Sequence, residues 1–240
     1  YSQEASTPVQ EEESDRNNMD KDVEITEIEA AISKQEATDK AIDDDGIHPI
    51  ILKKLGATAK IILQKIFNEC LSTGSWLWKD SFVIFIRKAD KKSYTKPGDY
   101  RPITISSYFG KVFERISDNR ARIWLQSSGQ IDVDQEGFLS SRSTTRYLFR
   151  LLANLNEIKR KKLSCIIMFI DFAKAFDSVH IPTLIVKLEK MGFGMKMLGV
   201  IKTYLEDRAI RLKVNKFTGR SRRCGLFGLP RVLHSHPSCL

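Results

Sequence analysis

The longest uninterrupted apolar run in this chain of 240 residues has only six members, CIIMFI at 165–170, and Asp171 follows it directly. A run of this length is typical of a strand that is buried on both faces. No run approaches the roughly 18 apolar residues that a membrane-spanning helix needs, so no membrane span is expected. The sequence is 42% apolar, which is enough for one sizeable core or two small ones and excludes global disorder.

Charge is distributed unevenly along the chain, whose net charge is +9. Residues 1–46 contain 15 Asp and Glu against 4 Lys and Arg, so the remaining residues have a net charge of +20. The acidic segment 1–23 is predicted to be a flexible tail or linker. A body this basic suits a polyanionic partner, nucleic acid first, and ordinary solubilising charge is the alternative.

Cysteine and histidine positions give a second set of expectations. The four cysteines form no CxxC pair, which predicts reduced thiols in an intracellular setting: Cys70, Cys165, Cys224 and Cys239. Four residues near the C-terminus could hold a tetrahedral zinc ion, in a spacing that fits no standard zinc motif: Cys224, His234, His236 and Cys239. His48 is predicted to lie in a loop and His180 at a helix start. The chain begins with tyrosine and has no signal-peptide pattern, so we expect a fragment of a longer reading frame.

Hydrophobic periodicity predicts six helices and few strands, a combination that indicates an α+β or α/β fold. The first helix is expected behind a capping box formed by Thr26 and Glu29. The other helices are expected at 57–72, 107–127, 143–160, 181–190 and 195–207. Extended segments are expected at 81–88, 100–107, 163–171, 210–215 and 220–226. On helix 57–72, six residues are predicted to alternate between two faces with a period of 3.6: Ile61, Ile62, Lys65, Ile66, Glu69 and Cys70. An apolar stripe is predicted on helix 143–160: Tyr147, Leu148, Leu151, Leu152, Leu155 and Ile158.

The sequence FIDFAKAFDSV (169–179) has the most specific chemistry in the chain. The apolar strand is expected to deliver Asp171 to its exposed C-terminal end, where a carboxylate can bind a divalent metal. The backbone carbonyl of Phe172 can point to the same side. The alternative is purely structural: Asp171 ends a strand and Asp177 caps the next helix.

FIDFAKAFDSV resembles the first palm motif of reverse transcriptases of non-LTR (LINE-type) retrotransposons. Four other parts of the chain resemble blocks of the same family, in the family's order. They are DGIHPIILKKLG with FNECLSTGSWLWKDSFVIFIRKADK, DYRPITISSYFGKVFERI, QEGFLSSRST, and LKVN followed by GLP. The resemblance covers about residues 24–230.

The resemblance implies an α+β fold: an incomplete right-hand polymerase with fingers and a partial palm, rich in helix, with a small and mostly antiparallel sheet. It also implies a division of the chain. After the tail at 1–23, residues 24–160 would form an N-terminal extension and a fingers-like region. Residues 161–230 would form a partial palm, and residues 231–240 a divergent tail.

The resemblance also assigns roles in the palm motif. Asp171 resembles the first catalytic, metal-binding aspartate, and the carbonyl of Phe172 would complete part of the metal shell. Phe176 occupies the position of a gate against the ribose 2′-hydroxyl, since a ring packed beneath the sugar leaves no room for an added oxygen. Asp177 resembles a structural residue that holds the turn.

Two further groups of residues resemble contacts to nucleotides and template. Lys88 and Arg101 resemble finger residues that hold the phosphates of the incoming nucleotide, a role that suits the planar fork of arginine; surface charge is the alternative. A loop and helix start resemble a template-contacting segment, with a simple N-cap as the structural alternative: Gly137, Phe138, Arg142, Ser143 and Thr144.

The implied reaction is nucleotidyl transfer, in which two Mg²⁺ ions (or Mn²⁺) stabilise the attacking and leaving oxygens. The implied partners are an RNA template, a DNA primer and dNTPs, without a membrane, and the implied location is the nucleus. The oligomeric state is left open.

The family pattern breaks near the C-terminus. Arg231 stands where the family has glutamine after GLP, and the chain contains no YxDD sequence, which supplies two further aspartates in the family. We therefore expect little or no polymerase activity from this chain, and a frameshift or a wrongly joined exon near residue 231. Two alternatives stay open: a non-catalytic, basic nucleic-acid-binding protein built on the same scaffold, and a relic whose unpaired strand edge favours aggregation.

Overall fold

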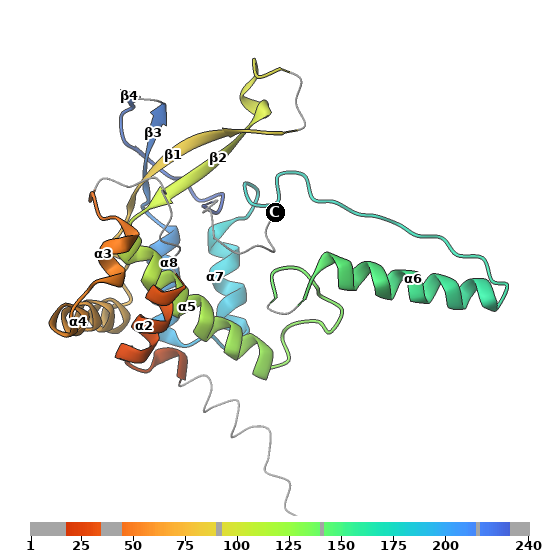
Figure 1. The fold of residues 1–240 in the computed structure, drawn as a ribbon, viewed down its shortest axis with the longest axis horizontal. Coiled ribbons are helices and arrows are strands. Elements are labelled where there is room, and N and C mark those ends of the chain that lie inside the picture. The colour runs from red at the N-terminus through yellow and green to blue at the C-terminus, as the bar shows by residue number, and fades with distance from the viewer. Residues whose placement is uncertain (1–17, 35–44, 90–92, 140–141, 215–216, 231–240) are drawn as a thin grey trace, which may run out of the picture.

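The computed structural model describes residues 18–34, 45–89, 93–139, 142–214 and 217–230. A group of helices packs into one core, a small twisted sheet lies against it, and one long helix projects away from both (Figure 1). The predicted α+β class, rich in helix with a small sheet, is confirmed. Among the described residues, no helix is both long and apolar enough to span a bilayer.

The helical core is built from α2 (Ile25–Ser33), α4 (Ala57–Thr73), α5 (Tyr108–Ser127) and α8 (Met195–Leu205), with the short helix α3 (Pro49–Lys53) beside them. Stacked aromatic rings occupy its centre. The rings of Phe67 and Phe113 lie 4.9 Å apart, and that of Trp76 lies 5.6 Å from Phe113 on the other side. Because α8 shares this core with α2 and α4, the proposed boundary at 160–161 does not separate two cores; as a division between family regions it stays a prediction.

Residues 18–23 pack against the core through Met19 and Val23, so the prediction of a flexible tail up to residue 23 is wrong for this part; residues 1–17 lie outside the described chain. Met19 and Val23 are each 1% exposed. Asp20 accepts hydrogen bonds from the backbone N–H groups of Lys196 (3.2 Å) and Met197 (2.9 Å), at the start of α8. The acidic composition of the segment does not predict this role, because the carboxylate of Asp20 caps a helix that begins 175 positions later.

The sheet has the strand order β2-β1-β3-β4, and β5 also pairs with β3. β1 (Asp80–Arg87) and β2 (Tyr100–Ser106) form an antiparallel hairpin through the 3₁₀ turn η1 (Pro97–Asp99). β3 (Ala209–Val214) runs parallel to β1, whereas the short strands β4 (Phe217–Thr218) and β5 (Arg222–Arg223) are antiparallel to β3. The predicted, mostly antiparallel sheet is therefore confirmed, with one parallel pair.

The predicted helices are all present, but some details differ. The capping residue of α2 is Glu24, not Thr26: the Glu24 side chain accepts from the backbone of Glu27, whose carboxylate accepts the N–H of Glu24 at 3.0 Å. The alternation predicted for α4 did not identify its buried face. Of the apolar residues in that pattern only Cys70 is buried, beside Leu63, Phe67 and Leu71, whereas three isoleucines are exposed: Ile61, Ile62 and Ile66.

The predicted buried strand at 163–171 is wrong. Residues 163–172 form no strand and pair with no strand in the described part of the chain. Ile166 is 95% exposed and Phe169 is 82% exposed. An apolar run becomes a strand only where a neighbouring strand satisfies its backbone N–H and C=O groups, and none lies beside this one.

The helix α6 (Thr144–Arg160) precedes this extended segment and shares its exposure. It forms where predicted, with Ser143 as its N-cap, but none of its residues is buried, so its apolar stripe covers no core. In Figure 1, α6 and the extended segment that follows it lie away from the remainder of the molecule. α7 (Ile181–Lys190) then brings the chain back to the core.

Candidate active site

Asp171 lies in the exposed segment 163–172, immediately before a turn at 173–178. Phe172, whose carbonyl was predicted to share in metal binding, has a side chain that is 78% exposed. Among the described residues, no group of three or more His, Cys, Asp or Glu side chains could hold a metal ion. Asp171 and the carbonyl of Phe172 therefore give too few oxygen ligands for two divalent ions.

The turn at 173–178 is stabilised by backbone contacts. The N–H of Ser178 donates to the carbonyl of Lys174 at 3.0 Å, and Lys174 has a left-handed φ of 53°. The next helix, α7, begins at Ile181 with His180 as its N-cap, as predicted for His180. The alternative interpretation of Asp177 as a helix cap is therefore wrong, because three residues separate it from the first residue of α7.

Residues 176–181 pair with residues 226–229, which places the FIDFAKAFDSV block beside GLP. The N–H of Leu229 donates to the carbonyl of Phe176 at 2.9 Å, and the N–H of Gly228 donates to the carbonyl of Val179 at 3.0 Å. Gly228 has a φ of +91°, which explains a glycine at this position. Nothing in the sequence periodicity predicts this contact between segments about 50 positions apart.

A third backbone bond and a ring contact extend the same pairing. The N–H of Ile181 donates to the carbonyl of Leu226 at 3.0 Å, and His180 forms a bridge with Phe227. The two rings lie 4.9 Å apart. The start of α7 is therefore held against the segment that leads into GLP.

Lys88 and Arg101 come together on the β1–β2 hairpin. Arg101 lies opposite Ile86, two positions before Lys88, so both cations belong to one face of the hairpin. Arg101 is exposed, and the ammonium of Lys88 donates to the carbonyl of Gly98 at 2.8 Å. The two cations that are predicted to bind the phosphates of the incoming nucleotide thus lie near one another. This binding role stays a prediction.

The predicted template segment is a loop that leads into α6. Ser143 Oγ accepts a hydrogen bond from the N–H of Arg146 at 3.2 Å. Ser143 therefore caps α6, as the structural alternative predicted. The guanidinium of Arg142 donates to the carbonyls of Val133 (2.8 Å) and Gln135, so this side chain organises the loop in which it lies.

The other predicted template residues differ in exposure and contacts. Phe138 is 69% exposed with a φ of 63°, and its carbonyl accepts from Arg122. Gly137 and Thr144 are exposed. No contact described here tests a role of this segment in template binding.

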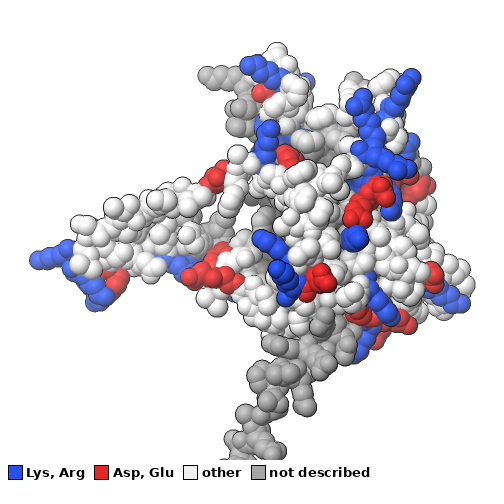
Figure 2. Space-filling model, turned by 180° about the vertical axis from the view of Figure 1, so that it is seen from behind, with Lys and Arg blue, Asp and Glu red and all other residues white. Residues whose placement is uncertain are grey.

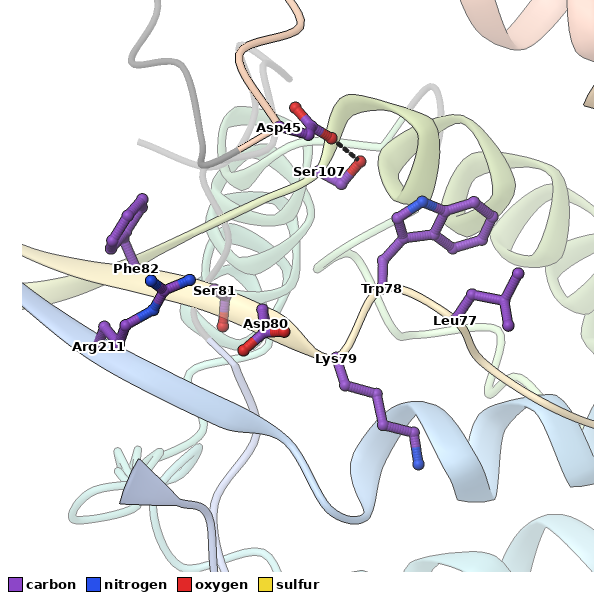
Figure 3. A pocket seen from close by; sticks show the side chains of 9 residues that line it. All are labelled: Asp45, Leu77, Trp78, Lys79, Asp80, Ser81, Phe82, Ser107 and Arg211. Atoms are coloured by element: carbon purple, nitrogen blue, oxygen red, sulfur yellow. Dashed lines mark hydrogen bonds between the residues drawn. The ribbon is translucent and has the colours of Figure 1, made fainter. Parts of the chain in front are cut away.

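Sequence reasoning did not predict a pocket at the start of β1, with a volume of about 350 Å³ (Figure 3). Asp45 and Ser107 lie on one side of it and are joined by a hydrogen bond of 2.7 Å. Ser81 lines the pocket and its buried hydroxyl has no hydrogen-bond partner among the described residues. None of the predicted catalytic or template residues lines this pocket.

The predicted zinc ligands fall mostly outside the described residues. Cys224 is half-buried, and its N–H donates to the carbonyl of Arg208 at 2.7 Å. His234, His236 and Cys239 lie outside the described residues, so the zinc site stays a prediction. His48 is not a simple loop residue, because its Nδ1 accepts the N–H of Ile50 at 3.2 Å and caps α3.

The family profile described as "Reverse transcriptase (RNA-dependent DNA polymerase)" matches residues 86–230. The chain belongs to this family. The match includes the end of β1, all of β2, the extended segment with Asp171 and the paired GLP segment, so the predicted family is confirmed.

Three relatives of this chain come from non-LTR retrotransposons of Drosophila melanogaster. It is 30% identical to the probable RNA-directed DNA polymerase from transposon BS, over 90% of this chain and 23% of the relative. It is 29% identical to the RNA-directed DNA polymerase from mobile element jockey, over 74% of this chain and 19% of the relative. Identity to the probable polymerase from transposon X-element is 29%, over 87% and 24% of the two chains. The chain thus spans a quarter or less of the length of these relatives.

Proposed function

We propose that this chain is the fingers and the first palm segment of an RNA-directed DNA polymerase from a non-LTR retrotransposon. The observation that supports this most strongly is the family match over residues 86–230. The pairing of residues 176–181 with 226–229 agrees with it, because two blocks of the family lie side by side. The complete enzyme would copy an RNA template by adding dNTPs to a DNA primer, in the nucleus.

Within this enzyme, Lys88 and Arg101 would hold the phosphates of the incoming nucleotide. Phe176, which is 43% exposed, would lie beneath the sugar and exclude a 2′-hydroxyl. The loop that contains Gly137 and Phe138 would contact the template. These roles rest on the family resemblance and on the exposure of the groups.

A divalent metal is a general requirement of the family, and Asp171 would contribute one carboxylate to it. The described residues alone do not fit two metal ions. We infer instead that this 240-residue chain, which contains no YxDD sequence, has little or no polymerase activity.

A primer-extension assay tests this inference. The purified chain is incubated with an RNA template, a DNA primer, dNTPs and either Mg²⁺ or Mn²⁺, beside the variant Asp171→Asn. No extension above the level of the variant is expected. Extension by the wild-type chain that disappears in Asp171→Asn would show that the chain is active.

A non-catalytic nucleic-acid-binding protein is the second candidate, because residues 47–240 have a net charge of +20. The coding context separates the two. Sequencing of the transcript beyond codon 230 will reveal a shifted frame that encodes the family's glutamine after GLP and then a YxDD sequence if the chain is a disrupted polymerase. A transcript without such a frame favours the binding protein.

A further inference from the structure

The extended segment 163–172 combines unpaired backbone groups with exposed apolar side chains. The N–H of Leu163 donates to the carbonyl of Ile158 at 3.0 Å, but among the described residues no other backbone group of the segment forms a hydrogen bond. Six of its large apolar side chains are between 61% and 95% exposed: Leu163, Ile166, Met168, Phe169, Ile170 and Phe172. An apolar segment with open N–H and C=O groups is a template for pairing with another strand.

The helix α6 enlarges this exposed surface. None of its residues is buried, and four large apolar side chains are exposed along it: Tyr147, Leu148, Phe149 and Leu152. Figure 2 shows the projecting part of the molecule as mostly white, with Lys and Arg side chains gathered at its tip, where α6 ends. Residues 144–172 number 29, which matches the roughly 20 to 30 residues that each partner contributes to a specific interface.

Charge at the two ends of the segment favours a second copy of the chain that runs antiparallel. Lys161 and Lys162 precede the segment, and Asp171 near its end is the only carboxylate in residues 158–176. An antiparallel copy brings the lysines of one chain close to Asp171 of the other, whereas a parallel copy sets like charges beside one another. Among the described residues, neither Lys162 nor Asp171 forms an ion pair within its own chain, so both are available to a partner.

Symmetry restricts the register of such a pair. Side chains that lie directly opposite one another on antiparallel strands share a face, so a two-fold-symmetric pair needs one residue opposite its own copy. A register centred on Ile167 meets this condition. It pairs all of residues 163–171, with Leu163 of each chain opposite Asp171 of the other.

The neighbouring registers are less favourable. A register centred on Met168 pairs as many residues but brings Lys162 of one chain level with Lys174 of the other, and like charges repel. A register centred on Ile166 would pair only residues 163–169, because the chain turns before residue 163 and Lys162 has a left-handed φ of 53°.

The two faces of the paired strands differ in polarity. One face of each strand contains Cys165 and Asp171, and a carboxylate favours contact with water. The other face contains four large apolar side chains: Ile166, Met168, Ile170 and Phe172. A two-fold axis perpendicular to the strands places this apolar face of both copies on one side, together with both copies of α6. The apolar stripe of α6, which covers no core in a single chain, can therefore cover it.

We propose that segment 163–172 pairs with the same segment of a second copy, antiparallel and centred on Ile167, and forms a two-fold-symmetric dimer. Backbone hydrogen bonds would hold the two strands together. Two strands alone are only marginally stable, so the α6 stripes would supply the further apolar contacts. This inference does not depend on the polymerase assignment, and its failure would leave that assignment unchanged.

Sedimentation velocity of the full chain tests the dimer. Wild type is compared with Ile166→Lys, which puts an ammonium group on the apolar face of the paired strands. Ile62→Lys is the matched control, because Ile62 is also exposed (55%) but lies on α4. Since Ile166 is 95% exposed, its replacement leaves the fold of the single chain intact.

We expect wild type and Ile62→Lys to sediment as dimers at high concentration and to dissociate together on dilution. Ile166→Lys should raise the dimer Kd about tenfold or more, because two unpaired charges per dimer would be buried. A wild type that stays monomeric up to about 100 μM, a weak affinity for a specific dimer, would overturn the proposal. So would equal weakening in the two variants, or wild-type assemblies that grow without a limit at two chains.

Disulfide cross-linking tests the register. Ile167→Cys in a Cys165→Ser background would place two thiols opposite one another, with Cα atoms about 5 Å apart, within the range of a disulfide. Oxidation should join residue 167 to its own copy, which peptide mass spectrometry identifies. Cys165 of wild type is the control, because it lies opposite Phe169 and about 14 Å along the strands from its copy. Cross-linking through Cys165 but not through residue 167 would overturn the register.

Discussion

Arg120 and Glu27, 93 positions apart in the sequence, form a bidentate ion pair. Nε of Arg120 donates to one carboxylate oxygen at 2.8 Å, and Nη2 donates to the other at 2.7 Å. The remaining N–H groups donate to the carbonyls of Met19 (3.1 Å), Lys21 and Asp22 (3.0 Å). One side chain that is 8% exposed thus connects α5, α2 and the segment before α2.

Replacement of Arg120 by alanine is expected to lower the free energy of unfolding by about 3 kcal/mol, because a carboxylate and three carbonyls lose their donor in a largely buried site. Urea denaturation measures the change. Lys60→Ala is the matched control, since Lys60 pairs with Glu29 of the same helix at 2.6 Å but in an exposed position. Lys60→Ala should lower the free energy of unfolding by at most about 1 kcal/mol. Similar losses in the two variants would contradict the central role of Arg120.

The same pair gives stability a pH dependence. Burial alone raises the pKa of Glu27, but the hydrogen bonds from Arg120 and from the backbone outweigh it, and the net pKa is lowered from the usual 4.5. A carboxyl with a lowered folded pKa stabilises the protein above its unfolded pKa, and this stabilisation is lost as the pH falls through the folded value.

Denaturation of wild type and Glu27→Gln at a series of pH values tests this dependence. The stability advantage of wild type should be constant above about pH 5 and should shrink as the pH falls below 4.5. An advantage that stays constant at acid pH would show that the charge on Glu27 does not stabilise the fold.

Gly74 is expected to tolerate alanine poorly. It ends α4 with a φ of +61°, and a Cβ there would lie 3.2 Å from the Cα of Gly199 in α8. Gly129 is the matched control, because it has a φ of +64° and nothing within 4 Å of the added atom. Gly129→Ala should cost about 1 kcal/mol for the left-handed backbone alone. Gly74→Ala should lower the free energy of unfolding by more than Gly129→Ala, and thermal denaturation measures the difference. Equal decreases in Tm would argue against close packing of α4 on α8.

Cys70 and Cys165 are expected to differ in reactivity. Burial first, and the nearby charge of Glu69 second, raise the pKa of the Cys70 thiol to about 11, whereas Cys165 lies exposed in segment 163–172. Iodoacetamide at pH 8 should therefore modify Cys165 rapidly and leave Cys70 unmodified, since only the thiolate reacts. Peptide mass spectrometry over time distinguishes the two sites. Slow modification of Cys165 in the native chain would show that another part of the protein covers this segment.

Local sequence patterns predicted where helices form better than they predicted which residues are buried and which strands pair. Helices such as α5 followed from apolar spacing, because Val112, Phe113 and Ile116 recur on one face and that face is buried. The strand at 163–171 failed because strand formation depends on a partner, which a run of apolar residues cannot supply by itself. Asp20 and Arg120 could not be predicted, since their partners are set by tertiary packing between segments far apart in the sequence.

The candidate site shows the same division. The family motifs identified Asp171, Phe176 and the GLP segment by residue type. The contact between Phe176 and the GLP segment, however, depends on the path that the chain takes through α7, α8 and β3. The packing of Arg211 and Lys213 of β3 over the ring of Phe82 could not be predicted, because it depends on a parallel strand pairing that the sequence does not specify.

The contact between residues 176–181 and 226–229 uses backbone atoms in all three of its hydrogen bonds, and only Gly228 has a φ that restricts its side chain. The mutual alignment of these two motifs is thus largely independent of side-chain identity. Copies of a mobile element accumulate substitutions once selection on them is relaxed. In such copies, this backbone contact would be kept longer than the carboxylates and cations that it positions. The architecture of a polymerase would then persist after its chemistry had been lost.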